Sequence, residues 1–244
     1  MKSSYVAVAL LGAAALVQSA NADPVNVGDW INFSAGPGAT TGSPGGEFNI
    51  HVYQSGYSFT SFCLEREEAM FFGPGSFGGS GGSPSFTHPF EVVGITDRAF
   101  AGGINTEDPG PGDPISSRTA YLYQNFVRGT LAGYDYAGPN RVASADALQN
   151  AIWFLEEEIA DPFDGIADPA TQALITSFLN LDLGAFTGIG DVRVLNIVYR
   201  WDGPGGVAGG NGQDILVVVP LPQTFGLGMA GLLGVVGVTA RRRR

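Results

Sequence analysis

Two apolar segments at the ends of the chain limit the folded part to the residues between them. The first starts with a positive charge at Lys2, continues as an apolar run over residues 6–17, and ends at Ala20-Asn21-Ala22. A positive start, a short apolar core and a small-residue site are typical of a secretory signal peptide, and the run is too short to span a bilayer. We therefore expect residues 1–22 to be removed on export.

The second apolar segment covers residues 225–240 and lies between a proline pair, Pro220 and Pro222, and four terminal arginines. Its length falls short of the roughly 20 residues of a permanent membrane span, and terminal arginines stay on the cytoplasmic side. We expect a transient membrane anchor. The arginines are Arg241, Arg242, Arg243 and Arg244.

The proline pair, the apolar segment and the terminal arginines together resemble a PEP-CTERM sorting signal over residues 220–244. The usual Pro-Glu-Pro is here Pro-Leu-Pro. The resemblance implies an exosortase-type processing enzyme as a partner. It also implies a Gram-negative bacterium, in which the protein passes through the inner membrane to the cell surface or extracellular matrix. Cleavage and retention of the tail both remain open.

The charge of the chain argues against a nucleic-acid partner. The 12 basic and 23 acidic residues give a formal net charge of −11. Without Lys2 and the terminal arginines, seven arginines and no lysine remain against the 23 acidic residues, whereas phosphate binding needs a basic surface. The absence of lysine would also protect a reactive electrophile in the domain, such as a thioester. A lysine amine of a neighbouring copy could attack it, whereas a guanidinium is a far poorer nucleophile. A general preference of acidic exported chains for arginine is the alternative.

Residues 23–219 suffice for one domain with its own core. Helical spacing predicts three helices, over residues 114–129, from an N-cap at Ser144 to Pro162, and over residues 169–179. Alternating apolar and β-branched residues predict strands at 25–34, 47–54, 58–65, 89–96, 192–201 and 214–219. We expect an α+β domain of mainly antiparallel sheet, a sandwich or a partly closed barrel, with two or three helices packed on one side.

Cys63 is the only cysteine of the chain, although exported proteins usually pair their cysteines. It is therefore buried and inert, bonded to another molecule, or used chemically. It lies in Phe62-Cys63-Leu64-Glu65 on a predicted strand, and Gln149 lies in Leu148-Gln149-Asn150-Ala151-Ile152-Trp153 on the second predicted helix. These segments resemble the two halves of a bacterial thioester domain, in which such a cysteine is crosslinked to such a glutamine.

The chemistry of this pair is simple. A thiolate that attacks the glutamine carboxamide releases ammonia and leaves an acyl-thioester, a stored electrophile. Gln149 lies one residue from the apolar stripe of its helix, formed by Leu148, Ile152, Leu155 and Ile159. Its side chain can therefore enter the dry seam between helix and sheet. We expect Phe62, Ile152 and Trp153 to line that seam.

The resemblance implies a cell-surface or matrix adhesion module that captures an amine-bearing ligand covalently, without a catalytic residue, a cofactor or a metal. The alternative is a non-catalytic structural or exopolysaccharide-associated surface protein, in which the pair is unreacted or only a stabilising crosslink. An envelope enzyme is a third class, which predicts a cleft with perturbed acids that the sequence does not show. Aspartate-rich turns at residues 108–113 and 161–168 lack the ligand spacing of an EF-hand.

Glu156 is the acid that we expect to relay a proton at this site. It lies seven residues past Gln149, on the same face of the predicted helix. Glu157 and Glu158 follow it directly. Because consecutive helix positions point apart, a solvated helix face is the alternative for all three.

Overall fold

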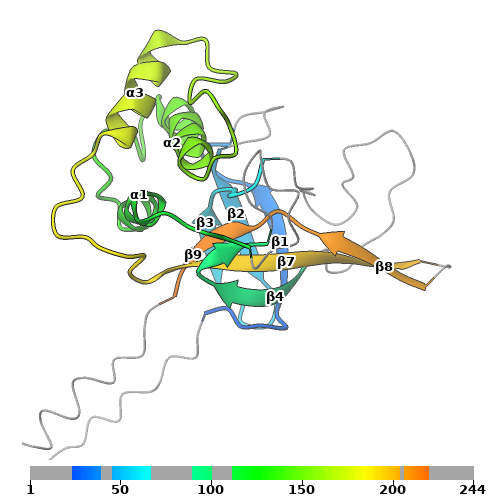
Figure 1. The fold of residues 1–244 in the computed structure, drawn as a ribbon. Coiled ribbons are helices and arrows are strands. Elements are labelled where there is room, and N and C mark those ends of the chain that lie inside the picture. The colour runs from blue at the N-terminus through cyan, green and yellow to red at the C-terminus, as the bar shows by residue number, and fades with distance from the viewer. Residues whose placement is uncertain (1–23, 40–45, 67–89, 101–111, 204–205, 220–244) are drawn as a thin grey trace, which may run out of the picture.

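The computed structural model describes residues 24–39, 46–66, 90–100, 112–203 and 206–219 (Figure 1). The predicted signal peptide and the predicted sorting tail lie outside these residues. Within the described part, no helix is long and apolar enough to cross a membrane.

A seven-stranded antiparallel sheet forms the main body of the domain, in the order β3-β2-β1-β4-β7-β8, with β9 as a further neighbour of β7. The sheet curves until the segment that follows β3 meets β9 at an isolated bridge between Cys63 and Ile215, so that it forms a nearly closed barrel (Figure 1). The predicted α+β class and partly closed barrel are confirmed. The strands are β1 (Trp30–Ala35), β2 (Phe48–Val52), β3 (Ser58–Ser61), β4 (Phe90–Thr96), β7 (Val192–Gly203), β8 (Gly206–Asn211) and β9 (Ile215–Val218), and β5 (Arg98–Ala99) pairs separately with β6 (Asp113–Pro114).

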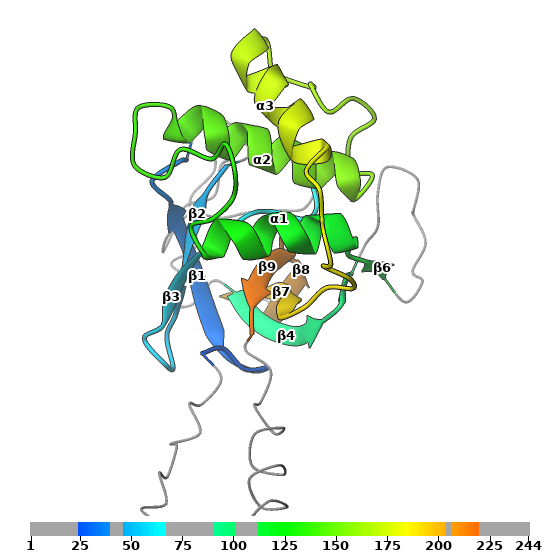
Figure 2. The same cartoon turned by 90° about the vertical axis from the view of Figure 1, so that its left-hand side faces the viewer.

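Three helices pack together on one side of the barrel, α1 (Ser117–Val127), α2 (Arg141–Leu155) and α3 (Pro169–Leu179) (Figure 2). The first begins after a hydroxyl N-cap at Ser116, and the third after a carboxylate N-cap at Asp168 with proline at its first position. Two or three helices on one side were predicted, and three are present.

The predicted bounds of the second helix are wrong at both ends. The helix begins at Arg141, so the expected N-cap Ser144 lies inside it, where its hydroxyl accepts the Asp135 N–H at 3.1 Å. At the other end the helix stops at Leu155, because Glu157 takes a left-handed φ of 62°. The sequence pattern continued to Pro162, since Ile159 keeps the apolar spacing without being helical.

Two apolar cores lie on the two faces of the sheet. One fills the space between sheet and helices and contains Phe62, Leu64, Leu148 and Ile152, while the other fills the barrel and contains Cys63. Side chains alternate between the faces of a strand, so the segment that follows β3 contributes to both cores. Leu155 is partly buried against the helical core.

Candidate functional site

The structure brings Cys63 and Gln149 together. The Gln149 carboxamide accepts the Cys63 N–H on Oε1 at 3.0 Å and donates from Nε2 to the Cys63 carbonyl at 2.8 Å. Both residues have no exposed surface. The Gln149 side chain thus pairs with the backbone of Cys63 as a residue on a neighbouring strand would. It does so on the side of β2, which does not extend as far as Cys63.

The backbone that follows Cys63 is held at every residue up to Arg66. Leu64 donates its N–H to the Asp214 carbonyl at 2.9 Å, and the Gln213 amide donates to the Glu65 carbonyl. Arg66 donates its N–H to Glu158 at 3.1 Å. These contacts come from the two residues just before β9 on one side and from the segment that follows α2 on the other. Because the cysteine segment cannot shift without breaking them, it is pre-organised.

The two hydrogen bonds of Gln149 bear directly on acyl transfer. A backbone N–H on Oε1 polarises the carboxamide and stabilises the negative charge that would develop on this oxygen during attack by a thiolate. The amide carbon is bonded to both Oε1 and Nε2, so it is held beside Cys63 together with them. The thiol of Cys63 belongs to the barrel core, from which water is excluded, and this slows hydrolysis of an acyl-thioester.

The three residues expected to line the seam divide between its two sides. Phe62 and Ile152 are fully buried in the core under the helices, and Trp153 is 5% exposed in the barrel core with Cys63. The indole Nε1 of Trp153 has no hydrogen-bond partner within the described part of the chain. Trp153 is therefore the expected lining residue that shares the core of the thiol.

Glu156 is bound to the start of α1. Its carboxylate accepts the Ser116 N–H at 3.2 and 3.3 Å and also accepts the Thr119 hydroxyl. Burial raises the pKa of this carboxyl above its ordinary value. The alternative of a solvated face is wrong for Glu156 and Glu158, which are 7% and 8% exposed. Proton relay by Glu156 stays a prediction, while its contacts give it a capping role.

Asp214 was not singled out by the sequence, yet it is a fully buried acid next to the segment that follows Cys63. Its carboxylate accepts the Phe100 N–H at 2.6 Å, the Asn196 amide at 2.9 Å and the Ile197 N–H at 3.3 Å. Burial raises the pKa of Asp214 to about 7. Its backbone carbonyl holds Leu64, so this acid supports the strand that carries Cys63.

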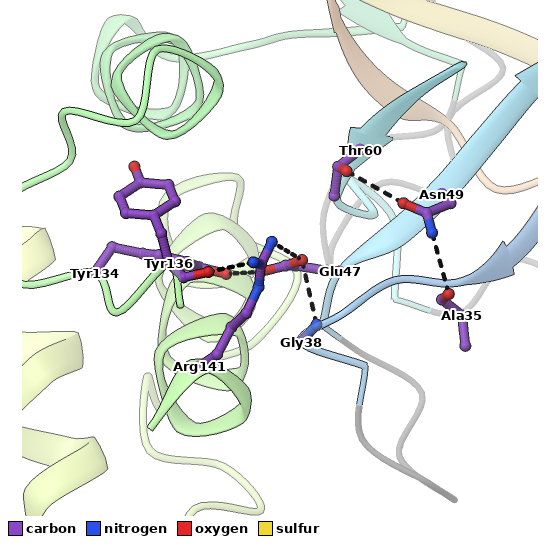
Figure 3. A network of polar contacts seen from close by, with 8 residues as sticks. All are labelled: Ala35, Gly38, Glu47, Asn49, Thr60, Tyr134, Tyr136 and Arg141. Carbon is purple, nitrogen blue, oxygen red and sulfur yellow. Dashed lines mark hydrogen bonds and ion pairs between the residues drawn. The ribbon is translucent and has the colours of Figure 1, made fainter. Parts of the chain in front are cut away.

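A second buried network ties α2 to the barrel (Figure 3). Glu47 is fully buried and accepts two hydrogen bonds from the Arg141 guanidinium, each at 2.9 Å. It also accepts the Tyr134 hydroxyl and the Gly38 N–H, and Arg141 donates to the Tyr136 carbonyl. Arg141 is the first residue of α2, so this ion pair positions the helix that carries Gln149.

Among the described residues, no group of three or more histidine, cysteine, aspartate or glutamate side chains is arranged to hold a metal ion. Pro220, Pro222 and the terminal arginines lie outside the described residues. Comparison of the chain with family models, with curated proteins and with solved structures finds no match. The class that fold and site define is an α+β barrel with a buried cysteine held by a helical glutamine.

Proposed function

We propose that the chain is an exported surface or matrix adhesion module that stores a thioester between Cys63 and Gln149 and uses it to capture an amine. The observation that carries this proposal is the pair of hydrogen bonds between the Gln149 carboxamide and the Cys63 backbone, at 3.0 and 2.8 Å. They hold the only cysteine of the chain beside the carboxamide with which it would react.

Two balanced steps make up the chemistry. In the first, the Cys63 sulfur attacks the amide carbon, the C–N bond breaks, and ammonia leaves with the thiol proton. In the second, an amine of the partner attacks the thioester carbon and the C–S bond breaks. Gln149 is then joined to the partner by an amide bond, and the thiol of Cys63 is restored. Neither step needs an oxidant or a cofactor.

A stabilising crosslink is the second candidate, and the complete burial of both residues favours it. The bond would connect residues 86 positions apart in the chain. By the chain-entropy relation for disulfides, closing a loop of that length stabilises a fold by roughly 4–5 kcal/mol. A sealed crosslink and an adhesive thioester share the same bond, and they differ in whether an amine reaches it.

Incubation of the native protein with methylamine separates the two candidates. An adhesive thioester gains one methylamine, and Cys63 then reacts with iodoacetamide. A crosslink that resists methylamine in the native state but reacts after unfolding in urea would rule out adhesion and leave the stabilising role. Cys63→Ala is the control, since it cannot form the bond.

Export and tail processing belong to the same proposal and have their own test. Fractionation of an exporting Gram-negative cell should place the mature chain, without residues 1–22, at the surface or in the medium. Full-length chain in the cytosol would contradict export without touching the chemistry of Cys63.

A further inference from the structure

The barrel fails to close along part of the seam between β3 and β9. The Cys63–Ile215 bridge joins β9 to the segment just after β3, and Ser61 at the end of β3 donates its hydroxyl to the Leu216 carbonyl at 2.6 Å. Beyond that point β9 pairs only with β7 within the described chain. A half-open cavity of about 350 Å³ lies there, which is at the lower end of the range for ligand pockets.

Both strands turn backbone groups toward this cavity. The Tyr57 carbonyl accepts the Val52 N–H at 2.8 Å and so faces β2. Because backbone groups alternate sides along a strand, Ser58 and Thr60 direct theirs away from β2, and Tyr123 donates its hydroxyl to the Thr60 carbonyl at 3.0 Å. By the same alternation Val218 faces the seam, since Val219 donates to Asp191 on the β7 side at 2.9 Å.

Aromatic side chains form much of the cavity lining. Phe126 is stacked between Tyr123 and Tyr136, with interplanar angles of 26° and 22°. Tyr57 and Phe59 stack on one another at 23°. The ring centroids lie 5.6–6.2 Å apart, so the rings are offset and together form an apolar wall, which suits contact with a bulky apolar side chain.

Charge complements the shape. Among the residues that the structure describes, Arg141 is the one charged side chain that lines the cavity, and Glu47 neutralises it (Figure 3). The chain as a whole carries a net charge of −11. An apolar side chain therefore enters the cavity without burying an unpaired charge, and basic residues on both sides of it are attracted by the acidic protein.

We propose that this seam cavity binds an extended peptide segment of a partner protein, which adds to β3 along the edge turned away from β2, beside the Thr60 carbonyl that Tyr123 already holds, and places a bulky apolar side chain among the aromatic rings. Lysines flank that side chain in the preferred segment. Strand addition obtains affinity from main-chain hydrogen bonds and specificity from a pocket for alternate side chains, and the seam supplies both. The proposal names the partner class of the adhesion module, and it rests on the proposed function only for the later covalent step.

The test uses full mature protein that carries Cys63→Ala, so that binding is measured without any thioester. Probes are blocked peptides of alternating threonine and valine with lysine at both ends, and with alanine, leucine, phenylalanine or tyrosine at the centre. We expect the large central residues to bind and to shift the Ser58 and Thr60 amide signals in ¹⁵N NMR spectra. Central alanine should bind at least tenfold more weakly.

One pair of variants tests the strand edge itself. Ser58→Pro removes an N–H that faces the seam and leaves the ladder with β2 intact, as proline does on edge strands. Loss of one main-chain hydrogen bond should weaken peptide binding about tenfold. Ser58→Ala keeps the N–H and should bind as the parent does. Thermal unfolding confirms that both variants are folded.

Several results would overturn this proposal while leaving the thioester untouched. One is that no peptide of the set shifts the Ser58 and Thr60 signals. Another is that peptides with N-methylated backbones bind equally well, since these cannot pair with a strand edge. Shifts of the same signals by a neutral oligosaccharide alone, or by self-association of the protein, would assign the cavity to a sugar or to a second copy. A missing thioester with intact peptide binding would instead refute only the proposed function.

Discussion

Replacing Gln149 with methionine, in protein that already carries Cys63→Ala, isolates the two hydrogen bonds that hold the cysteine segment. The background cannot form a thioester, and both bonds go to the backbone of residue 63, so they persist in it. Methionine is unbranched and of similar length, which keeps the cavity small. Each buried backbone group left without a partner costs about 1–3 kcal/mol. Since water does not reach the fully buried site, we expect a loss of about 2–6 kcal/mol in the free energy of unfolding.

Urea unfolding measures this loss as a lower transition midpoint at an unchanged slope. Gln172→Met is the matched control, because Gln172 makes one partly buried hydrogen bond, to the Ile166 carbonyl at 2.8 Å. We expect the control to lose about 1 kcal/mol or less. If Gln149→Met costs no more than the control, the glutamine does not hold the cysteine segment, and the geometric basis of the proposed chemistry is gone.

Three further predictions address the buried acids around the site. Burial raises the pKa of Asp214 from 3.8 to about 7, so the folded state holds its proton more tightly than the unfolded state. Stability should therefore fall as the pH rises from about 4 to 7, and Asp214→Asn should flatten this slope in urea unfolding at several pH values. Arg141→Leu leaves the fully buried Glu47 without its ion pair and should cost roughly 3–5 kcal/mol; adding Glu47→Leu should recover part of this loss, and no recovery would contradict the ion-pair account. Glu156→Ala removes the acceptor for Ser116 and should cost about 1–2 kcal/mol; it should also slow ammonia loss, and an unchanged rate would refute proton relay by Glu156 and leave it the capping role.

The local spacing of apolar residues was sufficient to predict much of the fold. The third predicted helix, residues 169–179, matches α3 because its start and stop signals are local, with Asp168 as the N-cap and proline directly after it. The burial of Gln149 followed from its place one residue from an apolar stripe. In contrast, β8 was missed because a strand of Gly206–Asn211 carries almost no β-forming side chains.

Contacts between distant segments account for most of what the sequence could not show. Glu47 and Arg141 are 94 residues apart, and Glu156 reaches Ser116 across 40. A single sequence contains no signal that pairs such residues, so carboxylates that are buried by tertiary contacts look solvated. Cys63 and Gln149 are 86 residues apart, and only the resemblance of their two short motifs singled them out.

The intact mass of the purified mature protein tests the central claim most directly. The thioester predicts a mass lower than the sequence mass by one ammonia, and the full sequence mass for both Cys63→Ala and Gln149→Ala, because each variant removes one partner of the bond. A mature wild-type protein with the full sequence mass, whose Cys63 is alkylated as soon as the protein unfolds and without any added amine, would contradict the account.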